Sequence, residues 1–186
     1  MAYQGFGQGL AEDGAVIGKF AAAGLSFFVS TSFSKSFSLY GERVGALSVV
    51  CESKDEAARV LSQLKLTIRT NYSNPPTHGA AVVSAVLNTP EWRALWEKEL
   101  GEMRTRIKAM RQALADGLKA AGVTQDMSFI VNQVGMFSYS GLSKEQMQRL
   151  RSEFGVYGTD SGRLCVAALN SRNIDHVCQA IAAVMK

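Results

Sequence analysis

The sequence predicts an α/β layer in its first half and a small α+β unit in its second half. Two short runs rich in β-branched and aromatic residues, 25–29 and 44–50, flank a serine-rich stretch. A periodic apolar pattern of roughly thirty residues follows, and beyond it strand-like and helical runs alternate. We therefore expect two domains, 1–100 and 101–186, joined by a long helix over about residues 90–121.

Composition allows a packed globular protein. The 186 residues are 47% apolar and 19% charged, which is enough to bury a substantial core. The net charge is +4, but basic and acidic residues alternate, as they do over 98–108. Interleaved charges are typical of a solvated helix face, whereas a nucleic-acid surface needs a one-sided basic face. We expect no nucleic-acid partner.

Cysteine usage and the N-terminal residues bear on the compartment. Cys51, Cys165 and Cys178 are odd in number and form no Cys-x-x-Cys pair, which favours free thiols in a reducing compartment. The first ten residues lack the basic start and apolar run of a signal peptide. No apolar stretch approaches the length of a membrane span. We expect a cytoplasmic protein with no membrane partner.

Imidazole chemistry has two candidates, His78 and His176, which lie far apart in sequence without a local ligand pattern. We therefore expect no metal site. A histidine-dependent nucleophile is disfavoured for the same reason, although the two residues could still meet in space.

In the first half, the expected elements follow from apolar spacing and turn residues. A helix over 12–24 carries Val16, Ile17 and Phe20 at helical spacing and ends in glycine. The two expected strands come next, the first of them buried. Ser53-Lys-Asp-Glu56 is a capping box that opens a helix with one apolar side, and 77–87 is a compact helix of small residues.

The longest periodic run begins after Thr89-Pro-Glu91, which places a cap and a first-turn proline at its start. Apolar residues recur at steps of three and four as far as Gly122: Trp92, Trp96, Leu100, Met103, Ile107, Met110, Leu114 and Leu118. A coiled-coil seam is the alternative to a helix packed on its own domain. Because the charges do not form flanking rows of opposite sign, we prefer the packed helix.

The second half reads as alternating short strands and helices. We expect strands at 129–131, 136–140 and 163–169. A second capping box, Ser143-Lys-Glu-Gln146, opens a helix to about Phe154. Asn170 or Ser171 caps a last helix that runs through Met185.

Lys35 lies in the connection between the first two strands, within a run of hydroxyl residues. Partial desolvation and a cationic neighbour such as Arg43 favour the neutral amine, which can attack a carbonyl. Arg43 and the hydroxyl of Ser32 or Ser34 are also suitable ligands for a phosphate group. Pyridoxal 5′-phosphate carries both an aldehyde and a phosphate. The alternative is an ordinary solvated lysine in a serine-rich loop.

The residues around Lys35 resemble a known signature. Ser32-Phe-Ser-Lys35, followed by Phe37-Ser-Leu-Tyr-Gly-Glu-Arg-Val-Gly45, is similar to the pyridoxal-lysine motif of the class I aminotransferases, in the aspartate and aromatic-amino-acid branch. Further matches occur in the family's order: 2–6, 68–76, 135–138 with 141–142, and 161–163. The resemblance covers essentially the whole chain but only the C-terminal part of the family's length. It implies the end of a fold-type I large domain followed by a small α+β domain.

The resemblance also implies roles at the cofactor. Lys35 is the Schiff-base lysine and afterwards moves a proton between the substrate Cα and cofactor carbon C4′. Ser32 and Arg43 bind the cofactor phosphate, and Tyr3 hydrogen-bonds the phenolic oxygen. The family's aspartate that bonds the pyridine nitrogen would stand two residues before Ala2, which is before Met1.

Two arginines match the family's substrate ligands. Arg163 corresponds to the arginine that binds the substrate α-carboxylate, a task suited to a bidentate guanidinium. Arg69 corresponds to the arginine that reaches into the site of the partner subunit and binds a distal carboxylate. Without the resemblance, Arg163 would be a surface arginine at a strand start and Arg69 a charge at a helix end.

These implications add up to one functional expectation and one alternative. We expect part of a homodimeric aminotransferase that moves an amino group between aromatic L-amino acids or aspartate and 2-oxoglutarate. We expect the chain by itself to be weakly active or inactive, because the pyridine nitrogen lacks its aspartate. The alternative is a non-catalytic assembly module that dimerises through the long helix or an exposed sheet edge.

Overall fold

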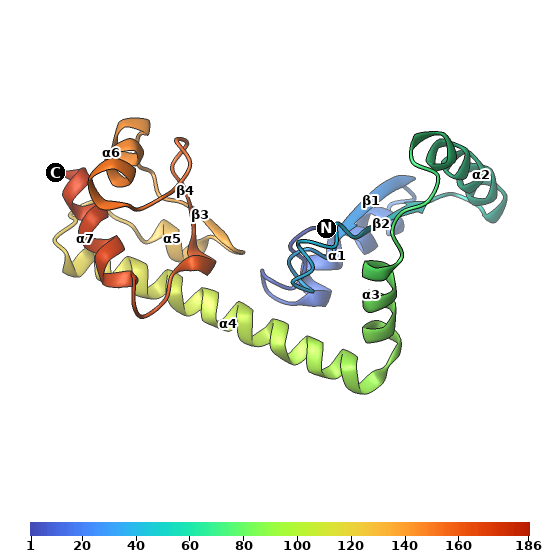
Figure 1. Cartoon of the computed structure of the whole chain (residues 1–186), viewed down its shortest axis with the longest axis horizontal. Helices are drawn as coiled ribbons and strands as arrows, with labels where there is room; N and C mark the ends of the chain where they lie inside the picture. Colours follow the sequence, from blue (N-terminus) through green and yellow to red (C-terminus); the bar gives the residue numbers. More distant parts are fainter. The chain divides into compact units, whose positions relative to one another are not determined.

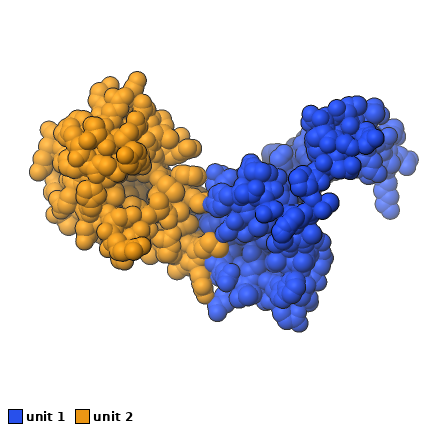
Figure 2. All heavy atoms as spheres, viewed as in Figure 1, with its two compact units in different colours: residues 1–101 blue, residues 102–186 orange.

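The computed structural model describes all 186 residues. The chain divides into two compact units, Met1–Gly101 and Glu102–Lys186 (Figure 2). Helix α4, Pro90–Ala120, begins in the first unit and ends in the second, close to the expected bounds of the long helix (Figure 1). Each unit is described by itself below.

Unit 1 contains a two-stranded antiparallel sheet and several helices. Its elements are α1 (Leu10–Ala22), β1 (Phe27–Ser32), β2 (Gly45–Val50), α2 (Lys54–Asn71), α3 (His78–Asn88) and the start of α4. The register places Phe27 opposite Val50 and Ser32 opposite Gly45. A Cβ on Gly45 would lie 2.5 Å from the Thr31 carbonyl oxygen, so this end of the sheet needs glycine.

The expected strands and helices of unit 1 are present, but the prediction that the first strand is buried is wrong. Phe28 in β1 is 67% exposed, and α1 and α2 contain no buried residue. Buried apolar side chains in this unit are limited to Phe6, Val83 and Leu100. The physical reason is that the sheet has only two strands and its cover is incomplete: Phe20 of α1 contacts Phe27 edge to face at 5.5 Å, whereas Phe28 stays exposed.

Unit 2 has a continuous apolar core. Its elements after α4 are α5 (Phe129–Asn132), β3 (Phe137–Tyr139), α6 (Lys144–Phe154), β4 (Arg163–Cys165), the 3-10 helix η1 (Val166–Ala168) and α7 (Ile174–Met185). Side chains that are almost completely enclosed come from α4, α5, α6, η1 and α7: Leu114, Leu118, Ile130, Met147, Leu150, Val166 and Ile181. Strands β3 and β4 pair antiparallel, with Phe137 opposite Cys165.

Two expected strands in unit 2 are wrong or too long. Residues 129–132 are helical, because the Asp126 carboxylate accepts the Ser128 backbone N–H at 2.9 Å and starts a turn that overrides β propensity. The strand expected over 163–169 ends at Cys165. Arg106 on α4 donates to the carbonyl oxygens of Ala167 and Leu169, which holds this stretch in the 3-10 turn.

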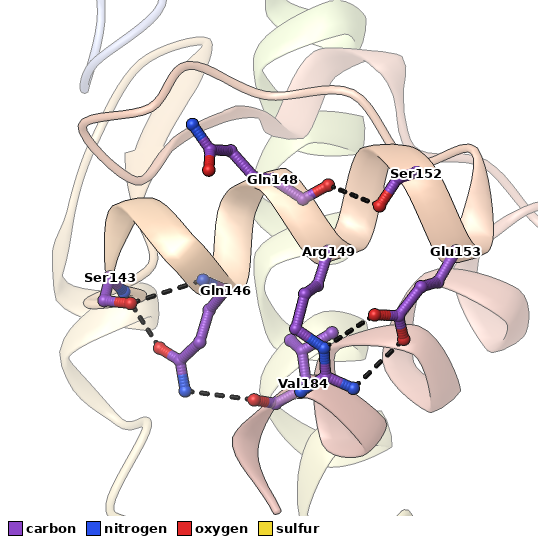
Figure 3. A network of polar contacts seen from close by, with 7 residues as sticks. All are labelled: Ser143, Gln146, Gln148, Arg149, Ser152, Glu153 and Val184. Carbon is purple, nitrogen blue, oxygen red and sulfur yellow. Dashed lines mark hydrogen bonds and ion pairs between the residues drawn. The ribbon is translucent and has the colours of Figure 1, made fainter.

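The capping box at the start of α6 is confirmed. The Ser143 hydroxyl accepts the Gln146 N–H at 3.3 Å, and the Gln146 side-chain oxygen accepts the Ser143 N–H at 2.8 Å. The same glutamine donates to the Val184 carbonyl oxygen at 3.1 Å, so the cap also ties α6 to α7 (Figure 3). Arg149 and Glu153 form an exposed pair on the next turn of the helix (Figure 3).

Three general features complete the description. None of the helices combines the length and the hydrophobicity that crossing a lipid bilayer requires. Histidine, cysteine and carboxylate side chains nowhere gather in a group of three or more that could hold a metal ion. The three cysteines are free, and burial, with a smaller contribution from Asp175, raises the pKa of Cys178 to about 11.

Candidate active site

Lys35 lies in a tight turn that leaves the end of β1. The Phe37 N–H donates to the Phe33 carbonyl at 3.2 Å, and the Ser38 N–H donates to the Lys35 carbonyl at 3.1 Å. Ser34 and Ser36, on either side of the lysine, are buried, whereas Lys35 itself is partly exposed. The backbone on both sides of Lys35 is therefore fixed while its amine stays accessible.

Helix α4 supports this turn through the side chain of Trp96. The indole N–H of Trp96 donates to the Ser36 carbonyl oxygen at 2.7 Å. The Phe37 ring stacks on the Trp96 ring with centroids 4.5 Å apart, and Phe33 meets Phe37 edge to face at 5.4 Å. The sequence pattern shows Trp96 only as part of an apolar stripe, because its contacts with the lysine turn join residues far apart in the chain.

Tyr3 lies beside Lys35. The Lys35 amine nitrogen lies 5.0 Å from the centroid of the Tyr3 ring, within the range of a cation–π contact. A backbone bond of 3.4 Å from the Ser32 N–H to the Met1 carbonyl holds the segment before Tyr3 beside the end of β1. The phenol and the amine are therefore neighbours.

Asp13 on α1 organises the glycine-rich segment after Tyr3. Its carboxylate accepts the backbone N–H groups of Gly5, Gly7 and Gln8 at 2.8–2.9 Å. Burial by itself would raise the pKa of Asp13, but hydrogen bonds from these groups and Gly9 outweigh it and lower the pKa. The sequence analysis missed this residue; the available signal was a carboxylate four residues after a run of glycines.

Ser32 and Arg43 stand at the two ends of the lysine connection. Ser32 closes β1 opposite Gly45, and its hydroxyl accepts the Ser34 N–H at 3.3 Å. Arg43 is exposed, has a φ of 52°, and donates to the Tyr40 carbonyl at 2.9 Å rather than to Ser32 or Lys35. A non-glycine residue at positive φ is strained, and such residues concentrate at functional sites.

Arg69 lies near the end of α2, where its guanidinium donates to the Ser73 hydroxyl at 2.6 Å. Ser73 also has a positive φ, 68°. The arginine is exposed, so it is available for a ligand from outside the helix. No hydrogen bond joins it to the lysine turn.

Arg163 belongs to unit 2 and is therefore described apart from the lysine turn. It opens β4, and its guanidinium carbon lies 4.8 Å from the centroid of the Phe137 ring. The backbone N–H of Arg163 donates to the Thr159 hydroxyl at 3.2 Å. Gly162 before it has a φ of 84° and no room for a side chain, since a Cβ would lie 3.0 Å from the Leu142 carbonyl oxygen.

Comparison with known proteins places this geometry in a family. Residues 1–181 match the family model described as aminotransferase class I and II. The chain is 64% identical over 185 residues to an aspartate aminotransferase of Pseudomonas aeruginosa, covering 100% of this chain and 46% of the relative. It is 57% identical over 185 residues to an aromatic-amino-acid aminotransferase of Escherichia coli, covering 100% of this chain and 47% of the relative.

A solved structure agrees with these relatives. The aromatic-amino-acid aminotransferase of Burkholderia pseudomallei, covalently bound to pyridoxal phosphate, superposes with a TM-score of 0.97 at 67% identity. The match covers 100% of this chain and 46% of that one, so the chain spans about half the length of the proteins it resembles. The chain belongs to the class I and II aminotransferases.

Proposed function

We propose that this chain forms the C-terminal part of a pyridoxal-phosphate-dependent aminotransferase that moves an amino group between aromatic L-amino acids or aspartate and 2-oxoglutarate. The observation that carries the proposal is Lys35, partly exposed in a hydrogen-bonded turn with its amine nitrogen 5.0 Å from the centroid of the Tyr3 ring. The family's relatives include both aspartate and aromatic-amino-acid aminotransferases. A non-catalytic assembly module is not favoured, because these relatives are named as enzymes.

The groups around Lys35 fit pyridoxal phosphate in their chemistry. An amine suits its aldehyde, a phenol suits its phenolic oxygen, and a hydroxyl with a guanidinium suits its phosphate. We assign Lys35, Tyr3, Ser32 and Arg43 to these contacts. Arg43 bonds to the Tyr40 carbonyl, so it would exchange that bond for the phosphate. When bound, the cofactor supplies an electron sink for the bonds at the substrate Cα.

The protein's own groups supply binding and proton movement. We assign Lys35 the transfer of a proton at the substrate Cα, because its partly exposed side chain extends from a hydrogen-bonded turn. Arg163 would bind the α-carboxylate that every amino acid carries. Arg69 would bind a distal carboxylate in the partner subunit, which makes a homodimer part of the proposal.

The domain assignment is also a proposal. We assign unit 1 to the large cofactor-binding domain and unit 2 to the small domain, with α4 as their connection. Cytoplasmic location remains an expectation from cysteine usage. We expect the 186-residue chain alone to show little or no turnover with tyrosine and 2-oxoglutarate, because it spans about half the length of its relatives.

Reductive trapping tests the cofactor assignment. The purified chain is mixed with pyridoxal phosphate, reduced with borohydride and digested, and the modified lysine is located by peptide mass spectrometry. We expect the label on Lys35, with Lys35→Arg losing it and Lys19→Arg, an exposed lysine on α1 of the same unit, retaining it. Labelling spread evenly over surface lysines would contradict the assignment of Lys35.

A further inference from the structure

Arg111 on α4 is the one charged side chain enclosed in the core of unit 2, with 2% of its surface exposed. Its guanidinium donates to the carbonyl oxygens of Ile130 at 3.1 Å and Gly135 at 2.8 Å, and also to that of Phe137. None of these bonds goes to a carboxylate. Its Nε has no hydrogen-bond partner at all.

Such an arrangement is costly for stability alone. A buried guanidinium without a counter-ion loses its hydration, and this burial lowers the pKa of Arg111. A methionine or leucine would remove the buried charge and its unpaired Nε, but it would also take the donor away from the carbonyl oxygens of Ile130, Gly135 and Phe137. The feature that only arginine provides here is a planar group that reaches several carbonyl oxygens at once.

The three acceptors lie in one short segment that leads into β3. Residues 133–136, between α5 and β3, have no regular secondary structure, and β3 itself has three residues. Few ladder bonds therefore fix this strand, and the Gln133 side chain adds bonds to the Tyr139 backbone at the end of β3 away from Phe137. Arg111 bonds to Ile130 within α5, to Gly135 in the irregular stretch and to Phe137, the first residue of β3.

The first residue of β3 is also the residue that contacts Arg163. Phe137 pairs with Cys165 and Tyr139 pairs with Arg163, so Phe137 and Arg163 are diagonal neighbours on one face of the sheet. The Phe137 ring lies 4.8 Å from the Arg163 guanidinium carbon. The carbonyl of Phe137 is thus bonded by one arginine while its ring supports another.

We propose that Arg111 is a positioning residue for Arg163, acting through the backbone of Phe137. By fixing where β3 begins, it sets the ring of Phe137 and thereby the orientation of the guanidinium that meets the substrate carboxylate. The inference rests on the proposed function in one respect, namely that Arg163 binds this carboxylate. The chain of contacts from Arg111 to Arg163 is independent of it.

Nuclear magnetic resonance of the 186-residue chain with labelled arginine tests this link directly. The Arg163 side-chain signals are assigned by their loss in Arg163→Lys. The contribution of the Phe137 ring to these signals is measured as the difference between their chemical shifts in the unsubstituted chain and in Phe137→Leu. Arg111→Lys keeps the charge but lacks the planar fork that bonds three carbonyls. In this variant we expect the Arg163 signals to move most of the way to their positions in Phe137→Leu.

Arg149→Lys is the matched control. Arg149 lies on α6 of the same unit and pairs with Glu153 on its own helix, away from the segment before β3 and from β4. We expect the Arg163 signals to stay at their unsubstituted positions in this variant. A purely structural role of Arg111 would lower the melting temperature of Arg111→Lys and leave the Arg163 signals of the folded chain unmoved, which would overturn the proposal.

Hydrogen exchange of the unsubstituted chain decides the case if Arg111→Lys does not fold. We expect the Arg111 guanidinium protons and the backbone amides of β3 to exchange through one shared opening. Markedly faster exchange of the guanidinium protons would contradict the link. These measurements involve no cofactor and no turnover, so a failure of reductive trapping at Lys35 refutes the proposed function without affecting this result, and the reverse also holds.

Discussion

Unit 2 buries many of its apolar side chains, whereas unit 1 buries few, although both carry the same kinds of sequence pattern. Leu114, Leu150 and Ile181 in unit 2 are at most 1% exposed. In unit 1, Phe28 is 67% exposed and Leu66 is 59% exposed. Apolar periodicity therefore identifies which face of an element can be buried, but burial itself depends on a second layer being present.

Truncating one leucine in each unit should give the largest contrast. Leu114→Ala leaves a cavity in a closed core, and we expect the free energy of unfolding of unit 2 to fall by about 3–5 kcal/mol. Leu66→Ala on α2 removes a solvent-exposed side chain and should change stability by less than about 0.5 kcal/mol. Urea unfolding followed by circular dichroism measures both. Equal losses would mean that α2 is packed in solution in a way that its exposure does not indicate.

The two arginines allow a functional contrast between the units, in an enzyme made active by co-expression with the remaining part of a relative. Arg163→Ala should depress turnover of aromatic and dicarboxylic substrates alike, by about 2–5 kcal/mol if its ion pair is desolvated. Arg69→Ala should reduce turnover of aspartate and glutamate while largely sparing tyrosine and phenylalanine. The measurement is the ratio of kcat/KM between substrate classes. If both variants affect both classes equally, the proposed division of labour is wrong.

Asp13 should make the Tyr3 segment of unit 1 sensitive to acid. Asp13→Asn weakens the charge-assisted bonds to three backbone N–H groups, and we expect a loss of about 1–2 kcal/mol at neutral pH, because the site is partly solvated. The folded-state pKa of Asp13 lies below 3.8, the ordinary value of an aspartate. The stabilisation is therefore fully present above that value and disappears as pH falls through the lower, folded-state pKa.

The check on Asp13 is the pH dependence of amide exchange over residues 5–9, compared with the Asn variant. We expect the two proteins to converge in acid. A constant difference between them across the acid range would show that the carboxylate charge is not what holds the loop.

Substitution of two helix N-cap residues, one in each unit, should give the smallest contrast in stability. Ser143 has a reciprocal capping box on a helix packed against α7, so Ser143→Ala should cost about 1 kcal/mol of unfolding free energy. Ser53 also accepts a backbone N–H, at 3.1 Å, but its helix buries no residue. Ser53→Ala should increase amide exchange in α2 with a smaller effect on global unfolding. A larger global effect from Ser53 would reverse the order of stability that we assign to the units.

Local signals predicted much of the fold. The capping box at Ser143, the proline after Thr89 and the apolar stripe of α4 each act within a few residues, so a single sequence contains them. The helix at 129–132 was missed, because its β-branched and aromatic letters favour a strand and the deciding bond comes from Asp126 outside the run. The strand that begins at Arg163 was predicted too long, because Arg106, whose bonds hold the turn that ends it, is distant in sequence.

The candidate site shows the same difference between features set by neighbouring residues and features set by contacts across elements. The connection around Lys35 could be located from its own residues, and Tyr3 was placed near it by resemblance. Trp96 and Asp13 were missed as supports, because their roles depend on contacts across elements. Arg111 was missed for the same reason: within α4 an arginine is ordinary, and only its enclosure distinguishes it.

The indole of Trp96 gives the lysine turn an optical signal of its own. The chain has two tryptophans, and Trp92 is 54% exposed, whereas Trp96 is partly buried and stacked on Phe37. A soluble quencher should therefore suppress the emission of Trp92 first and leave a signal dominated by Trp96. Because Trp96 is hydrogen-bonded to the residue next to Lys35, that residual fluorescence can follow events at the lysine in real time, without a label or a coupled assay.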